Sequence, residues 1–427
     1  MIKPLKQSGC FSIPAIILLW VSVALQGCAT KSLTEARNQF YRGDVQKAVE
    51  TLQDENRIPK RNKLLLFMEK GMALHEVGDY KGSIETLLKA SELIREQDVI
   101  SVTKQSASLI TSEWVMEYKG EYSERLWVHT YLMMNFLLTG QNEEALVEAK
   151  QALQMYDDFP EPLKKDYFSR ALIALCFESL GEINGAYIEY KKLSEALSDA
   201  SIIAPELYRL AVRLGFSDDA LIYEKMISEA YLSYLKENPS SELVVFIGTG
   251  SIPKKVPGDI VIPPAYRFSF PQYLDVERDF NWVEPFESFR KLQGVTVVTN
   301  AGEVVKSSLE DRRASVIIKE TARVAAKELI ARKVDDDAGA AVGALLRIAF
   351  FAMEEADTRC WQTLPRSLAL LRVPLEPGDH KIQIDVSGKG GMNNKVMLPE
   401  FKLDRGSKVF FSIRLGENFS LLSTRME

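Results

Sequence analysis

The distribution of prolines and apolar residues divides the chain near residue 239. Only three prolines, Pro160, Pro162 and Pro205, occur between residues 61 and 238, whereas eleven of the seventeen fall from Pro239 onward. Because proline interrupts helices, the first part is expected to be helical and the second to mix strands with helices. The stretch "NPSS" (residues 238–241) ends the last helix, and residues 242–247, which are apolar after Glu242, predict a buried strand directly after it.

The helical part repeats itself around five glycines. A glycine in a left-handed conformation allows a tight turn, and a small residue allows two helices to approach closely. The residue five positions after each glycine is Ala or Ser, which predicts five helix–turn–helix units. The intervals between glycines are 35, 62, 41 and 34 residues, so the long one predicts an inserted or degenerate helix pair around residues 94–124. The glycines are Gly43, Gly78, Gly140, Gly181 and Gly215, and the small residues are Ala48, Ser83, Ala145, Ala186 and Ala220.

These units resemble the tetratricopeptide repeat (TPR), whose period is 34 residues, over about residues 33–235. The resemblance implies a solenoid of stacked helix pairs with a concave surface that binds peptides or partner proteins. Aromatic residues crowd the stretch "SEWVMEYKGEYSERLWVHTY" and are candidates for partner binding in such a groove. Their helical spacing suits a core equally well, so both readings stay open. The candidates are Trp114, Tyr118, Tyr122, Trp127 and Tyr131.

The second part predicts short strands around two helices. Strands are expected over residues 266–270, 280–283 and 294–298, and the closing runs "SLALLRVPLEPGDHKIQIDVSG" and "KVFFSIRL" predict a small antiparallel sandwich with a turn at Pro377-Gly378. The glycines of "GTGSIPKK" lack the Gly-Lys-Ser/Thr ending of a phosphate loop, which favours an ordinary loop. The predicted fold class is therefore α+β, with a TPR-like solenoid over residues 28–238 and a mixed domain over residues 239–427.

A long amphipathic helix is expected over residues 307–333, with Ile317, Val324 and Leu329 on one side and Arg and Lys on the other. Ser308 is a candidate N-cap for it. Residues 335–337, three consecutive aspartates, are expected at the start of a second helix, where carboxylates complement the positive end of the helix dipole. A metal site is not expected, because neighbouring carboxylates on a helix point too far apart. Gly339 and Gly343 have the GxxxG spacing of closely packed helices.

The N-terminus has the pattern of a bacterial export signal. Lys3 and Lys6 precede an apolar run of about 16 residues, too short to span a bilayer, so residues 1–27 are predicted to be a cleaved signal peptide. "LQGC", ending at Cys28, resembles the bacterial lipobox, which implies that Cys28 carries the lipid anchor. Ala29 after the cysteine implies sorting to the outer membrane. The alternative is an ordinary secretory signal that leaves Cys28 as a free thiol.

Charge, cysteine count and histidine spacing bear on the partners and sites that this chain can have. Removing residues 1–27 removes two lysines and no acid, so the net charge of −6 becomes −8, which argues against nucleic acid as a partner. Besides Cys10 and Cys28, only Cys176 and Cys360 remain; they pair in an oxidising periplasm, or Cys176 is a buried thiol. The three histidines, His75, His129 and His380, are scattered, and no motif predicts a catalytic site, a metal or a cofactor.

The string "ADTRCWQTLP" (residues 356–365), with the helix and strand runs around it, resembles a family of bacterial lipoproteins that carry helical repeats in front of a mixed domain. The resemblance implies a role in the cell envelope and supplies no catalytic residues. Asp357 and Arg359 are expected to form a buried pair that positions Trp361.

The leading hypothesis is therefore a non-enzymatic scaffold, anchored through acylated Cys28 to the outer membrane and facing the periplasm, whose repeats bind an envelope protein. Two alternatives remain: an assembly or pilotin-like factor for an outer-membrane complex, and a hydrolase with convergent acids in a cleft between the halves.

Overall fold

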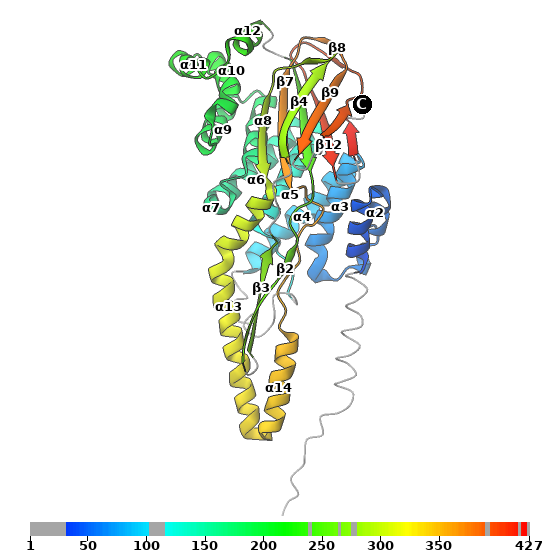
Figure 1. Ribbon diagram of the computed structural model, residues 1–427, viewed down its shortest axis with the longest axis vertical. Helices are drawn as coiled ribbons and strands as arrows, with labels where there is room; N and C mark the ends of the chain where they lie inside the picture. Colours follow the sequence, from blue (N-terminus) through cyan, green and yellow to red (C-terminus); the bar gives the residue numbers. More distant parts are fainter. Residues whose placement is uncertain are drawn as a thin grey trace, which may run out of the picture.

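The structure is a computed structural model. It describes residues 31–101, 116–237, 241–263, 266–274, 280–388, 393–416 and 420–424. The first part is a series of helix pairs, which covers one face of a five-stranded sheet, and a long helical hairpin extends away from that body (Figure 1). The class is α+β, as predicted.

Five helix pairs form the array. All five glycines of the predicted repeat have positive φ angles between 74° and 85° and lie in the turns within the pairs. All five small residues that follow them are buried. In the second pair Ser83 donates a hydrogen bond to the carbonyl of Gly71, at 2.7 Å, where the helices approach most closely. The pairs are residues 31–41 with α2 (Val45–Thr51), α3 (Lys63–Glu76) with α4 (Tyr80–Ser101), α5 (Tyr122–Leu138) with α6 (Asn142–Asp158), α8 (Tyr167–Ser179) with α9 (Ile183–Ala196), and α10 (Ala204–Leu214) with α11 (Ser217–Glu224).

The long interval between the second and third glycines, where an inserted or degenerate helix pair is expected, is described only in part. Helix α4 extends to Ser101 and therefore takes up part of it. Residues 116–121 are non-helical, and residues 102–115 lie outside the described part. Two further helices, α7 (Pro160–Leu163) and α12 (Glu229–Glu237), follow the third and fifth pairs.

The second part contains two sheets. The larger has the order β13-β12-β1-β7-β6 and is mixed, because β1 runs parallel to β12 and antiparallel to β7. The smaller has the order β10-β9-β4-β5. The antiparallel sandwich predicted from the sequence is therefore correct in its two layers and wrong for the β1–β12 pair. The strands are β1 (Glu242–Thr249), β4 (Phe280–Glu287), β5 (Arg290–Lys291), β6 (Val295–Asn300), β7 (Ser367–Pro374), β9 (Ile382–Gly388), β10 (Asn393–Met397), β12 (Lys408–Leu415) and β13 (Ser420–Thr424).

The larger sheet is covered on both faces, which explains the uninterrupted apolar run of β1. Val244 and Phe246 point towards the helices and join their core, whereas Leu243, Val245 and Ile247 face the smaller sheet. Successive side chains of a strand alternate between its faces, so one short strand ties the helical array to both sheets. Two small ladders complete the domain: β8 (Gly378–His380) with β11 (Phe401–Leu403), and β2 (Lys255–Ile262) with β3 (Tyr266–Tyr273).

The helical hairpin differs from the sequence expectation in its boundaries. Helix α13 (Ala301–Ala338) begins six residues earlier than predicted, capped by Asn300 instead of Ser308, which is buried within it. The three aspartates end α13 and do not start α14 (Ala340–Met353). Gly339 makes the turn with a φ of 94°. A Cβ on Gly343 would clash with Asp335 of α13, which confirms the predicted close packing.

Candidate functional site: the concave face of the repeats

The concave face of the array is occupied by the chain's own second part. Helices α3, α5 and α8 contact strands of the larger sheet, and the apolar residues of both form one core (Figure 1). Phe168 of α8 packs edge-on against Phe246 of β1. His75 of α3 hydrogen-bonds Asn135 and Ser412, at 2.6 and 3.0 Å, and burial lowers its pKa to about 4, so the ring is neutral at physiological pH. The groove that the repeats were expected to offer to a partner is thus filled.

A segment without helix or strand, residues 354–366, runs along this face and turns at residues 362–364; we call it the strap. Its backbone is bound by side chains of the helices. The carboxylate of Glu69 on α3 accepts hydrogen bonds from the amides of Gln362 and Thr363, at 3.0 and 3.2 Å. Arg37, in the first helix, donates to the carbonyl of Cys360 at 2.9 Å. Helix side chains that satisfy the backbone of such a segment make a peptide-binding site, and here the peptide belongs to the same chain.

The start of the strap is held by the pair predicted from the sequence. Arg359 and Asp357 are joined at 2.7 Å, and both are half-buried and not fully buried as expected. The guanidinium also donates to the carbonyls of Arg61 and Met116, at 3.2 and 3.0 Å, and lies over the ring of Tyr118. The pair therefore fastens the strap to the loops before α3 and α5.

Trp361 is the apolar anchor of the strap. It is fully buried, its amide donates to Glu124 of α5 at 2.7 Å, and its ring lies 5.8 Å from that of Tyr131. Tyr118 and Tyr131 were candidates for binding a partner. They do line the face of the repeats that holds this segment, but both are buried and their contacts are with the strap, so they are not exposed to another molecule.

The other aromatic candidates lie elsewhere. Trp127 is fully buried and donates its indole N–H to Asp166 at 2.8 Å, which makes it part of the core. Tyr122 is half-buried and stacks on Phe159 with ring centroids 3.8 Å apart. Trp114 and Cys28 lie outside the described residues. Of the two readings left open by the sequence, the core reading holds for Tyr118, Trp127 and Tyr131, because their helical spacing places them inside.

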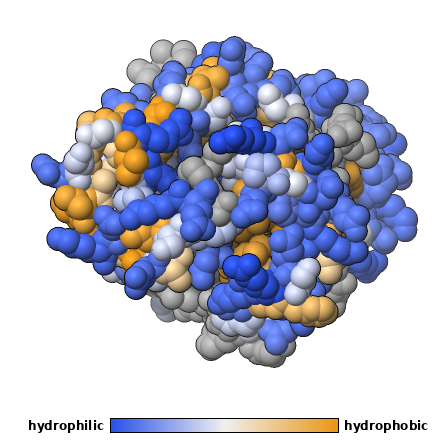
Figure 2. Space-filling model, turned by 90° about the horizontal axis from the view of Figure 1, so that it is seen from above, coloured by the Kyte–Doolittle hydropathy of each residue, from blue (hydrophilic) through white to orange (hydrophobic). Residues whose placement is uncertain are grey.

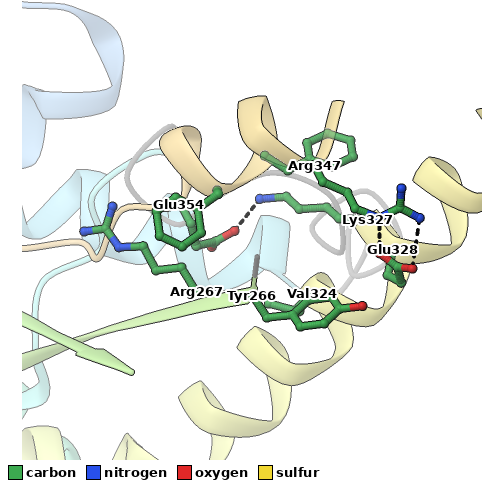
Figure 3. A pocket seen from close by; sticks show the side chains of 9 residues that line it. Tyr266, Arg267, Val324, Lys327, Glu328, Arg347 and Glu354 are labelled. Carbon is green, nitrogen blue, oxygen red and sulfur yellow. Dashed lines mark hydrogen bonds and ion pairs between the residues drawn. The ribbon is translucent and has the colours of Figure 1, made fainter. Parts of the chain in front are cut away.

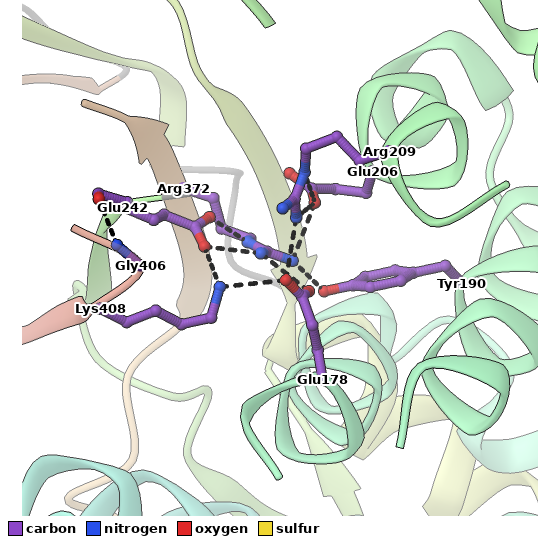
Figure 4. Close-up of polar contacts among 9 residues, drawn as sticks. Glu178, Tyr190, Glu206, Arg209, Glu242, Arg372, Gly406 and Lys408 are labelled. Atoms are coloured by element: carbon purple, nitrogen blue, oxygen red, sulfur yellow. Dashed lines mark hydrogen bonds and ion pairs between the residues drawn. The ribbon is translucent and has the colours of Figure 1, made fainter. Parts of the chain in front are cut away.

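A buried ionic cluster joins the end of the array to the larger sheet (Figure 4). Arg372 of β7 contacts Glu242 of β1 at 2.7 Å, Glu178 of α8 at 3.0 Å and Glu206 of α10 at 3.2 Å. Arg209 and Lys408 supply two more positive charges, each 3.1 Å from Glu178. Three carboxylates therefore face three cations.

The cations of the cluster lower the pKa of two of its carboxylates. Burial by itself raises the pKa of Glu242, but the charges of Arg372 and Lys408 outweigh it and lower that pKa to about 2. Burial likewise raises the pKa of Glu178, and Arg372, Lys408 and Arg209 lower it well below its usual value. These are the convergent acids that a hydrolase between the halves requires, but they are buried and paired, which suits a structural role.

The sequence carried one signal for this cluster. Arg372 interrupts the apolar run "LALLRVPL", and a charge in a doubly covered strand requires a partner. Its acidic partners lie on three separate elements, so the sequence did not identify them.

A second ionic cluster lies inside the helical hairpin (Figure 3). Arg347 of α14 bonds Glu328 at 2.9 Å and Asp335 at 2.8 Å, both on α13. Lys327 is paired with Glu354, which also accepts from Arg323 at 3.2 Å. Arg323 and Lys327 are buried, whereas Ile317 and Leu329 are exposed. Between residues 320 and 331 the amphipathic helix expected here is thus inverted, with charged residues facing inward, whereas Arg313, Lys319, Arg332 and Lys333 outside that stretch are exposed.

The structure also places the two remaining cysteines and the other two histidines. Cys176 and Cys360 are both buried and unpaired with each other. His129 contacts Glu148 at 2.7 Å, and His380 contacts Glu287 at 2.9 Å, on separate parts of the molecule. In the described part of the chain, no group of three or more His, Cys, Asp or Glu side chains is placed to hold a metal ion. Nor does any helix within the described ranges combine the length and apolar character needed to cross a bilayer.

Comparison with known proteins concerns the helical half. The sequence matches no protein-family model, and no curated protein matches it. Three solved structures resemble it over about half of the chain: MamA from Desulfovibrio magneticus RS-1 (14% identity, TM-score 0.33, 49% of this chain and 96% of that one), a Rap protein complexed with competence and sporulation factor (13%, 0.30, 48% and 52%), and the TPR-like repeats of a Podospora anserina kinesin light chain (16%, 0.34, 49% and 96%).

The N-terminal part is a TPR-like helical array. The positive-φ glycines, the buried small residues and the paired helices of this structure carry that description, since the likenesses are too weak to add to it.

Proposed function

We propose that this protein is a lipid-anchored scaffold of the bacterial cell envelope that binds a protein partner at the open end of its helical array. Supporting this is one observation: the last repeat exposes the apolar face that a following repeat would cover. Leu221 and Ile222 of α11 are each 56% exposed, and Val212 and Phe216 beside them are also exposed. Stacked repeats bury such faces against their neighbours, so an uncovered one is suited to a partner.

The position of this face favours it over the groove. Figure 2, which views the molecule from the end where α10–α12 lie, shows apolar side chains gathered on its left among polar ones. The concave face, in contrast, holds the strap and the sheet with fully buried contacts. Binding a partner there would require the second part of the chain to detach, whereas the α11 face is open already.

The anchor in this proposal is Cys28 in "LQGC", and Ala29 after it points to the outer membrane with the protein in the periplasm. The first helix of the array is described from residue 31, three residues after the cysteine, so an acylated Cys28 would hold the array close to the lipid surface. No enzymatic activity is part of the proposal.

The test is crosslinking in intact cells, followed by identification of what is captured. We expect one envelope protein to be captured by the parent chain and lost from the Leu221→Asp variant. Val147→Asp is the matched control, because Val147 is 57% exposed on α6, away from the last repeat. Capture that persists in Leu221→Asp would overturn the binding site. A Cys28→Ala variant that stays in the membrane fraction would overturn the anchor. Transient capture would favour the assembly-factor role over a stable subunit.

A further inference from the structure

The helical hairpin of α13 and α14 has its polarity reversed. Among the described side chains of α14, every exposed one is apolar. Leu345 is 67% exposed and Ile348 62%. On α13, the exposed residues between Glu320 and Ala331 carry no charge, whereas the buried ones include Glu320, Arg323 and Lys327. A helix pair surrounded by water is expected to do the opposite, so this exterior is suited to contact with another apolar surface.

Most of the charged groups inside the hairpin are paired within it. Lys327 and Arg323 share Glu354, and Arg347 is held by Glu328 and Asp335 (Figure 3). The Nε of Arg323 and one carboxylate oxygen of Glu320 have no hydrogen-bond partner in the described part of the chain. These charges face inward, which leaves apolar side chains on the outside of this part of the hairpin.

Among the exposed apolar residues, two stripes have heptad spacing. On α13 the stripe is Ile318, Ala322, Ala325 and Leu329, separated by four, three and four residues. On α14 it is Val342, Leu345, Ala349 and Ala352, separated by three, four and three residues.

The two stripes lie on opposite sides of the hairpin. At about 100° per residue, Leu329 points roughly away from Lys327, which faces α14. Leu345 points away from Arg347, which faces α13, in the same manner. Apolar residues at alternating spacings of three and four are the pattern by which helices pack along their length.

We propose that these stripes bind each other between copies of this chain, with the α13 stripe of one copy against the α14 stripe of the next. The inference goes beyond the partner at α11 and does not depend on it. The many alanines favour a helix as the occupant over lipid, because small side chains let backbones approach closely.

Charge at the base of the stripes agrees with this pairing. Exposed Lys319 and Lys333 border the α13 stripe, and exposed Glu355 follows α14. When two hairpins lie side by side in the same direction, Lys319 comes near Glu355 of the next copy. Two copies of the α13 stripe in the same direction would instead place lysines together.

The size of the contact predicts the form of the assembly. Each stripe is about 20 Å long and one helix, about 10 Å, wide. Such a strip falls well short of the roughly 800 Å² per partner that a stable pair buries. Each copy has two complementary stripes on opposite sides. Both stripes of one copy can be bound at the same time only in a ring or an open row of copies, and a closed ring leaves no stripe exposed.

The experiment is disulfide crosslinking of the full chain in cell membranes and, in parallel, of the purified chain at high concentration. Leu329→Cys and Leu345→Cys are made singly and together. Cys176 and Cys360 are buried, and the parent chain controls for Cys10 and Cys28. Because positions 329 and 345 face opposite ways, a disulfide between them joins two chains.

We expect the double variant to give a ladder of oligomers. A mixture of the two single variants should give crosslinked dimers. Each single variant alone should give a severalfold lower yield of crosslinked dimer. The matched control is the pair Val147→Cys and Val212→Cys, both over half exposed on the array. A ladder no stronger than this control would overturn the proposal, as would efficient crosslinking of one single variant with itself. The proposal would also be overturned if no crosslinks formed and a dye on Leu345→Cys reported that this position is buried in lipid vesicles.

Discussion

Glu69 and Thr363, which lie 294 residues apart in the sequence, are joined twice: one carboxylate oxygen of Glu69 accepts from the amide of Thr363 at 3.2 Å and from its hydroxyl at 2.6 Å. The same carboxylate also accepts from Arg37, so a single buried side chain couples the first repeat, the second repeat and the strap. The concave face and its occupant are therefore one cooperative unit.

Replacing Glu69 should loosen the strap. In Glu69→Ala, the buried amides of Gln362 and Thr363 lose their acceptor, and Arg37 loses its partner. We expect the free energy of unfolding to fall by about 3 kcal/mol or more, as for other broken buried pairs. Denaturant titration measures the loss, and hydrogen exchange should accelerate first at residues 360–363. Glu85→Ala, at an exposed site on α4, is the control and should change little.

Removing the central cation of the buried cluster should be equally damaging. Arg372→Met leaves Glu178, Glu206 and Glu242 with two cations instead of three, and we expect a loss of about 3–5 kcal/mol in urea unfolding. Arg405→Met replaces an exposed arginine of the same domain and serves as the control. Equal stabilities of the two variants would contradict the structural role of the cluster.

The pH dependence of stability should include a contribution from Glu76. Burial raises the pKa of this carboxyl from 4.5 to about 7, so between these values the folded chain holds a proton that the unfolded chain releases. Stability from this group is complete below pH 4.5 and is lost as the pH rises through 7.

Glu76→Gln keeps the neutral form at every pH. We expect it to match the parent chain at low pH and to be more stable at pH 8 by on the order of 3 kcal/mol. Thermal unfolding across this range measures the difference. The exposed Glu85→Gln should show no such trend, and a variant that is less stable at pH 8 would show that the charged form is the favoured one.

The turn glycines should be needed for their backbone conformation alone. Gly181 has a φ of 82°, and a Cβ placed there would meet no atom within 4 Å. Gly181→Ala should therefore cost about 1 kcal/mol purely from the left-handed backbone. Asn184→Ala, at an exposed position in the same repeat, should be neutral or slightly stabilising, since alanine favours helix.

Local sequence patterns predicted several turns, helix contacts and one strand of this protein. Gly43 and its four equivalents specify turns because only glycine adopts positive φ without cost, and Ala145 or Ser83 specifies a close helix approach because a larger side chain would not fit. The apolar residues 243–247 indicated a buried strand. The lipobox at Cys28 is also a local pattern and stays a prediction.

Tertiary structure alone decided what occupies the concave face and which side of α13 faces outward. Tyr131 and Leu329 both fit an amphipathic pattern, yet Tyr131 is buried beneath Trp361, 230 residues away, and Leu329 is exposed. Periodicity defines the two sides of a helix but not what each side meets. That depends on partners such as Glu354 for Lys327 and Glu124 for Trp361, which only the folded chain brings together.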